Sequence, residues 1–240
     1  LGYSYREHAC VSSIIGEALP VTLSLALGAL VLWLIVGIGL GVLAARYKGK
    51  IVDSASTVFV LIGTSLPTFL TGLMLLVFVV IKWRWLPFPA GNYTPFFEDP
   101  YEWAQILFLP WVTLAFAYAA LYTRFVRSAV IETSNEDYIR TARAKGLPEG
   151  KILGKHTLRS ALAPIVTMAG LDFAGLLGGA ILTESVFNLP GLGRLAIGAV
   201  VEYDLPLIVA TTLLAAAIVV LMNLIVDIAY AFIDPRVRIA

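Results

Sequence analysis

Cysteine, histidine and charge are all scarce in this sequence, and each shortage excludes a class of function. Cys10 is the only cysteine, so the chain can form no internal disulfide and no cysteine-based metal cluster. The two histidines, His8 and His156, lie too far apart in sequence to indicate a metal site. Only 14% of the residues are charged, and the net charge of +1 offers no general attraction for nucleic acid.

Patterns that carry catalysis are also missing. No segment has the Gly-x4-Gly-Lys-Ser/Thr form of a phosphate-binding loop, and no nucleophile pairs with a base in a recognisable pattern. We therefore expect a chain that is not an enzyme and that holds no cofactor or metal of its own. The sequence also contains no internal repeat, no low-complexity tract and no signal-peptide pattern.

Apolar residues dominate what is present. They make up 59% of the chain, and the mean hydropathy is +0.88. Five apolar runs are long enough to cross a hydrocarbon core, which takes about 20 helical residues. These runs cover approximately residues 18–45, 52–81, 106–129, 162–181 and 205–232. The pattern predicts an all-α, polytopic bundle of membrane helices.

The distribution of basic residues orients these spans. With the segment 132–160 in the cytoplasm, thirteen of the seventeen lysines and arginines fall on the cytoplasmic side. The four exceptions are Arg6, Lys82, Arg84 and Arg194. Because cytoplasmic loops carry the excess of basic residues, this orientation is favoured, with residue 1 outside and residue 240 inside. One further span is then expected before residue 1.

The segment 132–160 is the one long polar and basic interval in the sequence. Residues 135–145 fit a helix, and Ser134 with Asp137 has the spacing of a capping box. Gly146 can supply the left-handed residue that ends a helix, and Pro148 suits the first position of a second one. The segment is therefore predicted to be a helix, a glycine break and a second helix.

The first of these two helices is amphipathic. Tyr138, Ile139 and Ala142 share one face, whereas Arg140 and Arg143 lie on the other. A small apolar ridge with basic flanks suits a groove on another protein. The alternative is a solvated loop whose arginines only mark the cytoplasmic side, and the pattern alone does not separate the two.

A family resemblance favours the first interpretation. The run Tyr-Ile-Arg-Thr-Ala-Arg-Ala-Lys-Gly that ends at Gly146, followed by His156-Thr-Leu-Arg and Pro164, resembles the cytoplasmic loop of ATP-binding-cassette importer permeases. The family motif is Glu-Ala-Ala, three residues, then Gly. Its places are taken here by Arg140, Thr141, Ala142 and Gly146. The missing glutamate, and Leu158-Arg159 in place of Leu-Pro, resemble the peptide-importer branch.

The resemblance implies a fold and a function for the whole chain. It is similar to the B-type permease subunit of dipeptide and oligopeptide importers, which have the type I importer fold and commonly six spans. In that family the loop is the coupling element that docks on the ATPase. The residues to which this role carries over are Tyr138, Ile139, Arg140, Thr141, Ala142, Arg143, Gly146 and Leu147.

The resemblance also implies partners. They are a second, similar permease, two ATP-binding-cassette ATPase subunits that bind ATP and Mg, an extracytoplasmic substrate-binding protein, and a peptide substrate. The expected location is the cell membrane. The expected segments are an extracytoplasmic piece at 1–17 and a permease domain at 18–240. This domain includes the cytoplasmic loop at 132–160 and the extracytoplasmic segments at 82–105 and 184–204.

Pro67 is predicted to interrupt the second span, because it removes a backbone donor. One interpretation is a bend that lines the translocation pathway, with Thr64 and Ser65 exposed to solute. The other is a packing kink in which both hydroxyls bond to their own helix. A serine, proline and phenylalanine element at this place in the family favours the first interpretation slightly.

Two acidic residues are further pathway or gate candidates. Asp172 lies within the fourth span, where a carboxylate costs about 2.5–3.5 kcal/mol on insertion scales. It either lines the route and favours a free amino group, or bonds a neighbouring helix. Glu184, with Phe187 and Arg194, resembles a segment typical of this permease branch. Glu184 either braces an outer gate through Arg194 or belongs to a simple surface turn.

Other functions remain as alternatives. A related nickel or glutathione importer would share the same motifs, although no His or Met cluster indicates a metal path. An ion-driven secondary transporter would need paired membrane carboxylates and related halves, which are absent from the sequence. A membrane scaffold that transports nothing is the third alternative.

Overall fold

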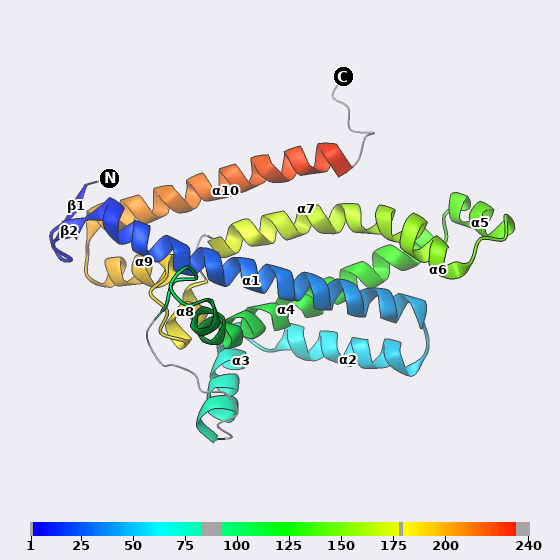
Figure 1. Cartoon of the computed structure of the whole chain (residues 1–240), viewed down its shortest axis with the longest axis horizontal. Helices are drawn as coiled ribbons and strands as arrows, with labels where there is room; N and C mark the ends of the chain where they lie inside the picture. The colour runs from blue at the N-terminus through cyan, green and yellow to red at the C-terminus, as the bar shows by residue number, and fades with distance from the viewer. Residues whose placement is uncertain (1, 83–92, 178–179, 234–240) are drawn as a thin grey trace. The chain divides into compact units, whose positions relative to one another are not determined.

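The computed structural model describes residues 2–82, 93–177 and 180–233, and nearly all of them are helical (Figure 1). The predicted all-α class is confirmed, with one small addition. Strand β1 (Tyr3–Ser4) pairs antiparallel with strand β2 (Ala9–Cys10), so that Tyr3 faces Cys10. This hairpin leads directly into the first long helix.

Among the residues that the structure describes, three helices are long and apolar enough to cross a membrane: α1 (Val11–Arg46), α4 (Pro100–Ser134) and α10, whose apolar stretch is Leu205–Val226. Two bent pairs of helices also qualify if each pair is counted as one span. One joins α2 (Ile51–Ser65) to α3 (Thr68–Leu75) and the π-helix η1 (Leu76–Lys82). The other runs from residue 149 to residue 177 and bends at Pro164, which lies inside a continuous helix. Counting each pair once gives the five predicted spans.

The remaining helices are mostly short. They are α5 (Asp137–Ala144), α6 (Glu149–Lys151), the π-helix η2 (Ile152–Thr157), α7 (Leu158–Leu177), α8 (Ile181–Val186) and α9 (Leu192–Val201), before α10 (Leu205–Ile233). The predicted break at Pro67 is confirmed, since α2 ends at Ser65 and Pro67 precedes α3. In contrast, Pro20 lies inside α1, which begins seven residues earlier than the apolar run predicts.

The residues divide into two compact units. The first contains Leu1–Val31, Leu66–Ala115 and Leu171–Asn223. Its core joins α1 to α9 and α10 through buried aliphatic side chains such as Ile15, Leu192 and Leu207. A second contact packs α1 on α4, where Trp111 Nε1 donates a hydrogen bond to the Ser24 carbonyl at 3.0 Å.

The second unit contains Leu32–Ser65, Phe116–Gly170 and Leu224–Ala240. Within it, α1 packs closely on α4, and Trp33 stacks on Tyr118 with ring centroids 4.6 Å apart. Gly37 and Gly41 permit this approach, because an added Cβ would lie 2.7 Å from Tyr122 Cβ and 2.6 Å from Val126 Cβ. Gly39 makes no such contact, since a Cβ there would meet no described atom within 4 Å.

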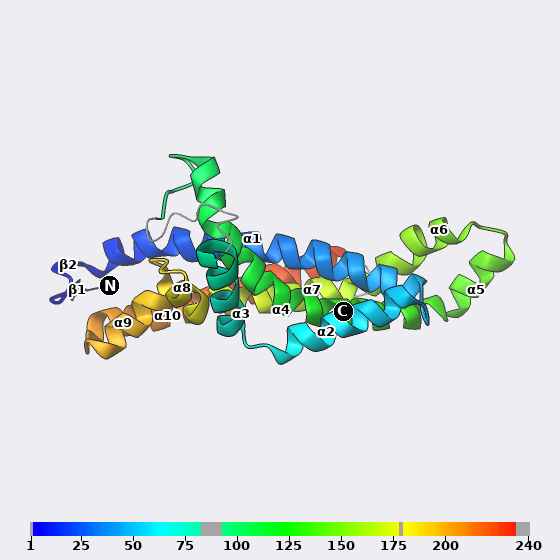
Figure 2. The same cartoon turned by 90° about the horizontal axis from the view of Figure 1, so that it is seen from below.

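Helices α5 and α6 also belong to the second unit. In both views they form a loop that projects from the ends of α4 and α7 (Figures 1 and 2). This loop is the segment that the sequence singles out, and its internal packing is described next.

Candidate functional sites

The loop formed by α5, α6 and η2 has a small hydrophobic core of its own. Ile139 is 0% exposed and Ile152 is 1% exposed. Together with Ala142 and the half-buried Leu147 they form one cluster. The apolar ridge of α5 therefore packs on its own chain. The prediction that Ile139 and Ala142 face a partner's groove is wrong, because the turn at Gly146 folds η2 back over them.

The glycine turn and several polar contacts fix this loop. Gly146 has φ +76°, as predicted for the residue that ends the helix. Beyond it, Arg143 Nε donates to Glu149 Oε1 at 2.7 Å. The Tyr138 hydroxyl lies 3.1 Å from Ser160 Oγ. The loop is thus closed on itself by a core, a turn and an ion pair.

The predicted capping box does not form. Ser134 is the last residue of α4, and its hydroxyl donates to the Val130 carbonyl at 2.6 Å. The residue that precedes α5 is Glu136, which makes no side-chain cap. Helix α4 continues as far as Ser134, so this hydroxyl bonds within its own helix and is not available to α5.

The side chains of α5 that remain exposed are polar or amphipathic. The Arg140 side chain is 69% exposed and Tyr138 is 46% exposed. Thr141 is also exposed, as is Lys145 immediately after the helix. A partner that docks on this loop would therefore meet hydroxyl and cationic groups, together with the exposed carboxylate of Asp137.

Thr64 and Ser65 keep features of both earlier interpretations. Their hydroxyls donate to the carbonyls of Val60 at 2.8 Å and Leu61 at 2.6 Å, which are bonds within α2. Both residues are nevertheless exposed. Their placement just before the break at Pro67 is as predicted, and a role in lining a pathway stays a hypothesis.

Glu184 lies at the centre of a buried hydrogen-bond network in the first unit. It is 0% exposed. Thr22 Oγ1 donates to Glu184 Oε1 at 2.7 Å, and the Arg194 main-chain N–H donates to Oε2 at 2.9 Å. The Leu192 N–H donates in turn to Thr22 Oγ1 at 2.8 Å. One carboxyl group thereby joins α1, α8 and the first turn of α9.

Burial raises the pKa of the Glu184 carboxyl, while the hydrogen bonds from the Arg194 N–H and Thr22 oppose this rise. The expected link from Glu184 to Arg194 exists through the main chain. The Arg194 guanidinium instead donates to Asn188 Oδ1. Glu184 does not belong to a simple surface turn, because its side chain is buried and hydrogen-bonded to two other helices.

The other two gate candidates differ in burial. Phe187 is 2% exposed, and a Cβ added at Gly72 would lie 3.1 Å from its ring. It is therefore part of the packing between α3 and the end of α8. Asp172 is half-buried in α7. Phe187 and Glu184 thus both stabilise the first unit from within.

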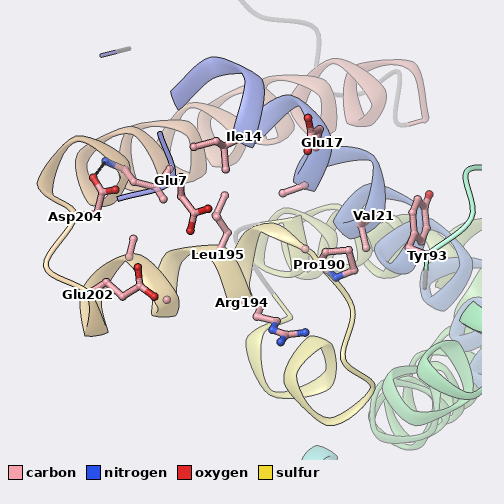
Figure 3. A pocket seen from close by; sticks show the side chains of 15 residues that line it. Glu7, Ile14, Glu17, Val21, Tyr93, Pro190, Arg194, Leu195, Glu202 and Asp204 are labelled. Atoms are coloured by element: carbon pink, nitrogen blue, oxygen red, sulfur yellow. Dashed lines mark hydrogen bonds between the residues drawn. The ribbon is translucent and has the colours of Figure 1, made fainter. Parts of the chain in front are cut away.

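A pocket of about 880 Å³ opens beside this network (Figure 3). Its wall combines apolar residues of α1, α9 and α10 with several carboxylates and one guanidinium. Asp204 accepts a hydrogen bond from the Ser4 hydroxyl. The charged lining residues are Glu7, Glu17, Arg194, Glu202 and Asp204. Sequence reasoning missed this pocket, because its acids lie nearly 200 positions apart.

A partly buried ion pair was also missed. Asp53, at the start of α2, accepts hydrogen bonds from Arg127 Nε at 2.6 Å and Nη2 at 2.9 Å. Asp53 also accepts from the Gly49 N–H at 2.9 Å, which closes the turn between α1 and α2. This bidentate pair ties that turn to α4. The only sign of this pair in the sequence was that an aspartate and an arginine each lie near the end of an apolar run.

Comparison with known proteins identifies the family. Residues 37–239 match the family described as the binding-protein-dependent transport system inner membrane component. The chain belongs to this family. These inner membrane components are multi-pass membrane proteins, which agrees with the apolar helices of the structure.

Two curated relatives of this transport component illustrate the similarity. "Probable peptide ABC transporter permease protein y4tP" of Sinorhizobium fredii is 42% identical over 95% of this chain and 72% of its own length. "Oligopeptide transport system permease protein AppB" of Bacillus subtilis is 39% identical over 97% of this chain and 74% of its own length.

Solved structures share the fold of this transport component. A chain of the MetNI methionine ABC transporter, in an inward-facing conformation, matches with a TM-score of 0.72 and 20% identity, over 93% of this chain and 97% of that chain. A chain from an amino acid ABC transporter matches with a TM-score of 0.65 and 17% identity, over 94% and 95%. The predicted type I importer permease fold is thereby confirmed.

Proposed function

We propose that this chain is the transmembrane subunit of an ATP-driven importer that moves dipeptides or oligopeptides into the cell. The observation that carries the proposal is the closed loop of α5, α6 and η2, found in a chain of the binding-protein-dependent family. Relatives about 40% identical are named as peptide permeases. The energy would come from two partner ATPase subunits, and the cargo from an extracytoplasmic binding protein.

In this proposal the loop lies on the cytoplasmic side and the chain pairs with a second, similar permease. The hairpin and the segment 184–204 lie on the outer side. The segment 82–105 is also placed outside, although its residues 83–92 fall outside the described structure. Arg236 and Arg238, which the sequence places on the cytoplasmic side, also fall outside the described structure. The basic residues of the loop satisfy the positive-inside rule in this orientation.

Helix α5 would transmit the movement of the ATPase subunits to the membrane helices by moving as one unit. Its exposed groups, chiefly Tyr138, Arg140 and Thr141, would contact the ATPase. The buried Ile139 and Ala142, with Leu147, hold the helix against η2 and thus against the start of α7. Closure of the ATPases on ATP would move the loop, and the helices that continue from it would switch between inward and outward access.

The charged pocket of the first unit supports a peptide substrate. A short peptide carries an amino group at one end and a carboxylate at the other. Glu17 and Glu202 would attract the amino group, and Arg194 would attract the carboxylate. The volume of about 880 Å³ is within the range of small-molecule sites. A nickel ion, by contrast, is a cation and would not be attracted by the guanidinium of Arg194.

The docking surface can be tested by co-purification with the ATPase subunits. The double variant Arg140→Glu, Lys145→Glu reverses charge on the exposed side of α5 and touches none of the buried cluster. We expect it to lose the ATPases. A matched control, Lys151→Glu with Lys155→Glu, makes the same charge change elsewhere on the loop and should retain them. Equal retention by both variants would show that α5 is not the docking element.

The substrate needs a separate measurement. The assembled transporter in proteoliposomes, with ATP inside and the binding protein outside, should accumulate a radiolabelled dipeptide. Omission of nucleotide should abolish the uptake. Accumulation of nickel or glutathione in place of peptides would overturn the substrate assignment while leaving the coupling proposal intact.

A further inference from the structure

The second unit contains a smaller cavity of about 420 Å³. Its wall is built from the end of α1, the end of α4 and residues of α5, α6 and η2. The residues that matter for its chemistry are Arg46, Lys48, Arg143 and Glu149, with Ala45 and Leu153 among the apolar ones. The proposed function assigns no ligand to this cavity.

The charges in this wall do not cancel. Arg143 and Glu149 neutralise each other through their ion pair at 2.7 Å. Arg143 also donates to the Ser134 carbonyl at 3.3 Å. Across the described parts of the chain, neither Arg46 nor Lys48 takes part in an ion pair. Asp53, which lies within electrostatic range of Lys48, is already paired with Arg127. The wall therefore keeps two cations that can attract an anion into the cavity.

The polar side chains near these cations already donate hydrogen bonds within their own chain. Ser134 donates to the Val130 carbonyl at 2.6 Å, and Asn135 donates to the Ile131 carbonyl at 3.0 Å. The Arg46 guanidinium lies 5.6 Å from the centre of the Tyr47 ring, which holds this side chain at the end of α1. The free recognition groups are thus a guanidinium and an ammonium, which suit a phosphate.

Exposed apolar side chains lie close in sequence to Arg46 and Lys48. Ile51 is 87% exposed and Leu43 is 44% exposed. In the proposed orientation these two side chains would be available to the acyl chains of the inner leaflet. A soluble phosphate would use only the cations, whereas a phospholipid would use the cations through its headgroup and the aliphatic side chains through its tails.

We propose that this cavity binds the phosphate headgroup of an anionic phospholipid from the inner leaflet, between Arg46 and Lys48. The proposal rests on the cytoplasmic placement of the loop given above. Because Arg143, Glu149 and Leu153 line the same cavity, a bound lipid would brace the coupling loop against the corner of α1. The lipid thereby becomes a regulator of coupling.

Native mass spectrometry of the purified full transporter, after mild delipidation, can test this site. The wild type should retain one phosphatidylglycerol per copy of this chain in preference to phosphatidylethanolamine. Arg46→Gln with Lys48→Gln should weaken retention by about thirtyfold, since each basic residue near an anionic surface contributes roughly fivefold. Lys151→Gln with Lys155→Gln, an equal loss of charge outside the cavity, should leave retention unchanged.

A second variant guards against misfolding of the first. Ala45→Phe fills the cavity without altering its charge, and it should also release the lipid. Equal retention in all variants would overturn the proposal, because the lipid would then be bound without this site. Displacement by inorganic phosphate at millimolar concentration would overturn the assignment to a lipid. A cysteine placed at position 151 that reacts with an impermeant reagent from outside the cell would refute the proposed orientation. This result would separate failure of the orientation from failure of the lipid site.

Discussion

At the residue scale, Glu184 shows how one buried carboxyl can organise three helices. Its two oxygens accept from Thr22 and from the Arg194 N–H, and Thr22 passes the connection on to the Leu192 N–H. Gly191 belongs to the same network, because a Cβ there would overlap the Glu184 carboxyl group. Removing the carboxyl would leave several buried donors without an acceptor, which costs more than the bonds themselves contribute.

We predict that Glu184→Ala lowers the free energy of unfolding by at least about 1–3 kcal/mol, the cost of one buried donor left unpaired. Thr22→Val, which removes one donor and keeps the shape, should cost less. Thermal unfolding of the detergent-purified protein, followed by fluorescence-detected size exclusion, measures both. A midpoint for Glu184→Ala equal to that of the wild type would contradict the role assigned to this network.

At the element scale, α1 is fitted to its neighbours by individual glycines rather than by a general glycine content. Gly37 and Gly41 lie against Tyr122 and Val126 of α4. Gly28 lies against Trp111, a contact that the sequence did not indicate. Gly39 has no described neighbour, although it stands between two glycines that do. The spacing of four residues places Gly37 and Gly41 on one face of the helix.

This arrangement supplies a matched pair of substitutions. Gly37→Ala forces a methyl group towards Tyr122, and such overpacking costs typically 1–3 kcal/mol. Gly39→Ala meets nothing and gains helix propensity, so it should leave stability unchanged or higher. Thermal midpoints of the two variants provide the comparison. The packing described for α1 and α4 is incorrect if Gly39→Ala proves the more harmful.

The loop of α5, α6 and η2 is the second element with a local stability of its own. Ile139 is the centre of its small cluster. We expect Ile139→Ala to cost about 2 kcal/mol locally, at the lower end for such truncations because the cluster is small. Amide hydrogen exchange across residues 137–157 should then accelerate roughly thirtyfold.

Thr141→Ala is the control for this experiment. Its hydroxyl is exposed and, among the described residues, bonds only to the Asp137 carbonyl at 2.9 Å. Its removal should therefore leave exchange in the loop unaltered. Unchanged exchange in Ile139→Ala as well would mean that the buried cluster does not hold the loop together. The polar variants proposed for ATPase docking should likewise leave exchange unaffected.

At the scale of the whole molecule, the central question is which groups lie on which side of the membrane. The natural Cys10 is exposed, and the proposed orientation places it outside. Lys151 is exposed on the loop, which is placed inside. The two positions therefore report the two sides of the membrane independently.

We predict that a membrane-impermeant maleimide labels Cys10 in sealed right-side-out vesicles. In a Cys10→Ser background, Lys151→Cys should be labelled only after the vesicles are permeabilised. Mass shifts of the purified chain provide the measurement, and permeabilised vesicles provide the control for reactivity. Labelling of position 151 in sealed vesicles would reverse the orientation and remove the loop from the ATPase side.

The sequence by itself determined the all-α class, the five apolar spans, the break at Pro67 and the turn at Gly146. It also determined the family, through a motif that is continuous along the chain. All of these depend on local chemistry: the hydropathy of a run, the missing donor of a proline, or the tolerance of glycine for positive φ. Such properties act between close neighbours in sequence and can be recognised without knowing which helices meet.

Only the tertiary structure decided which face of α5 is buried, which glycines of α1 are in contact, and which groups Glu184 and Asp53 bind. Thr22 and Glu184 are 162 positions apart, and Asp53 and Arg127 are 74 apart. Their pairing depends on how helices pack across the chain, because a buried carboxylate must find its donors wherever the fold brings them. Periodicity assigns a side chain to a face of its helix, and the neighbouring helix decides what that face meets.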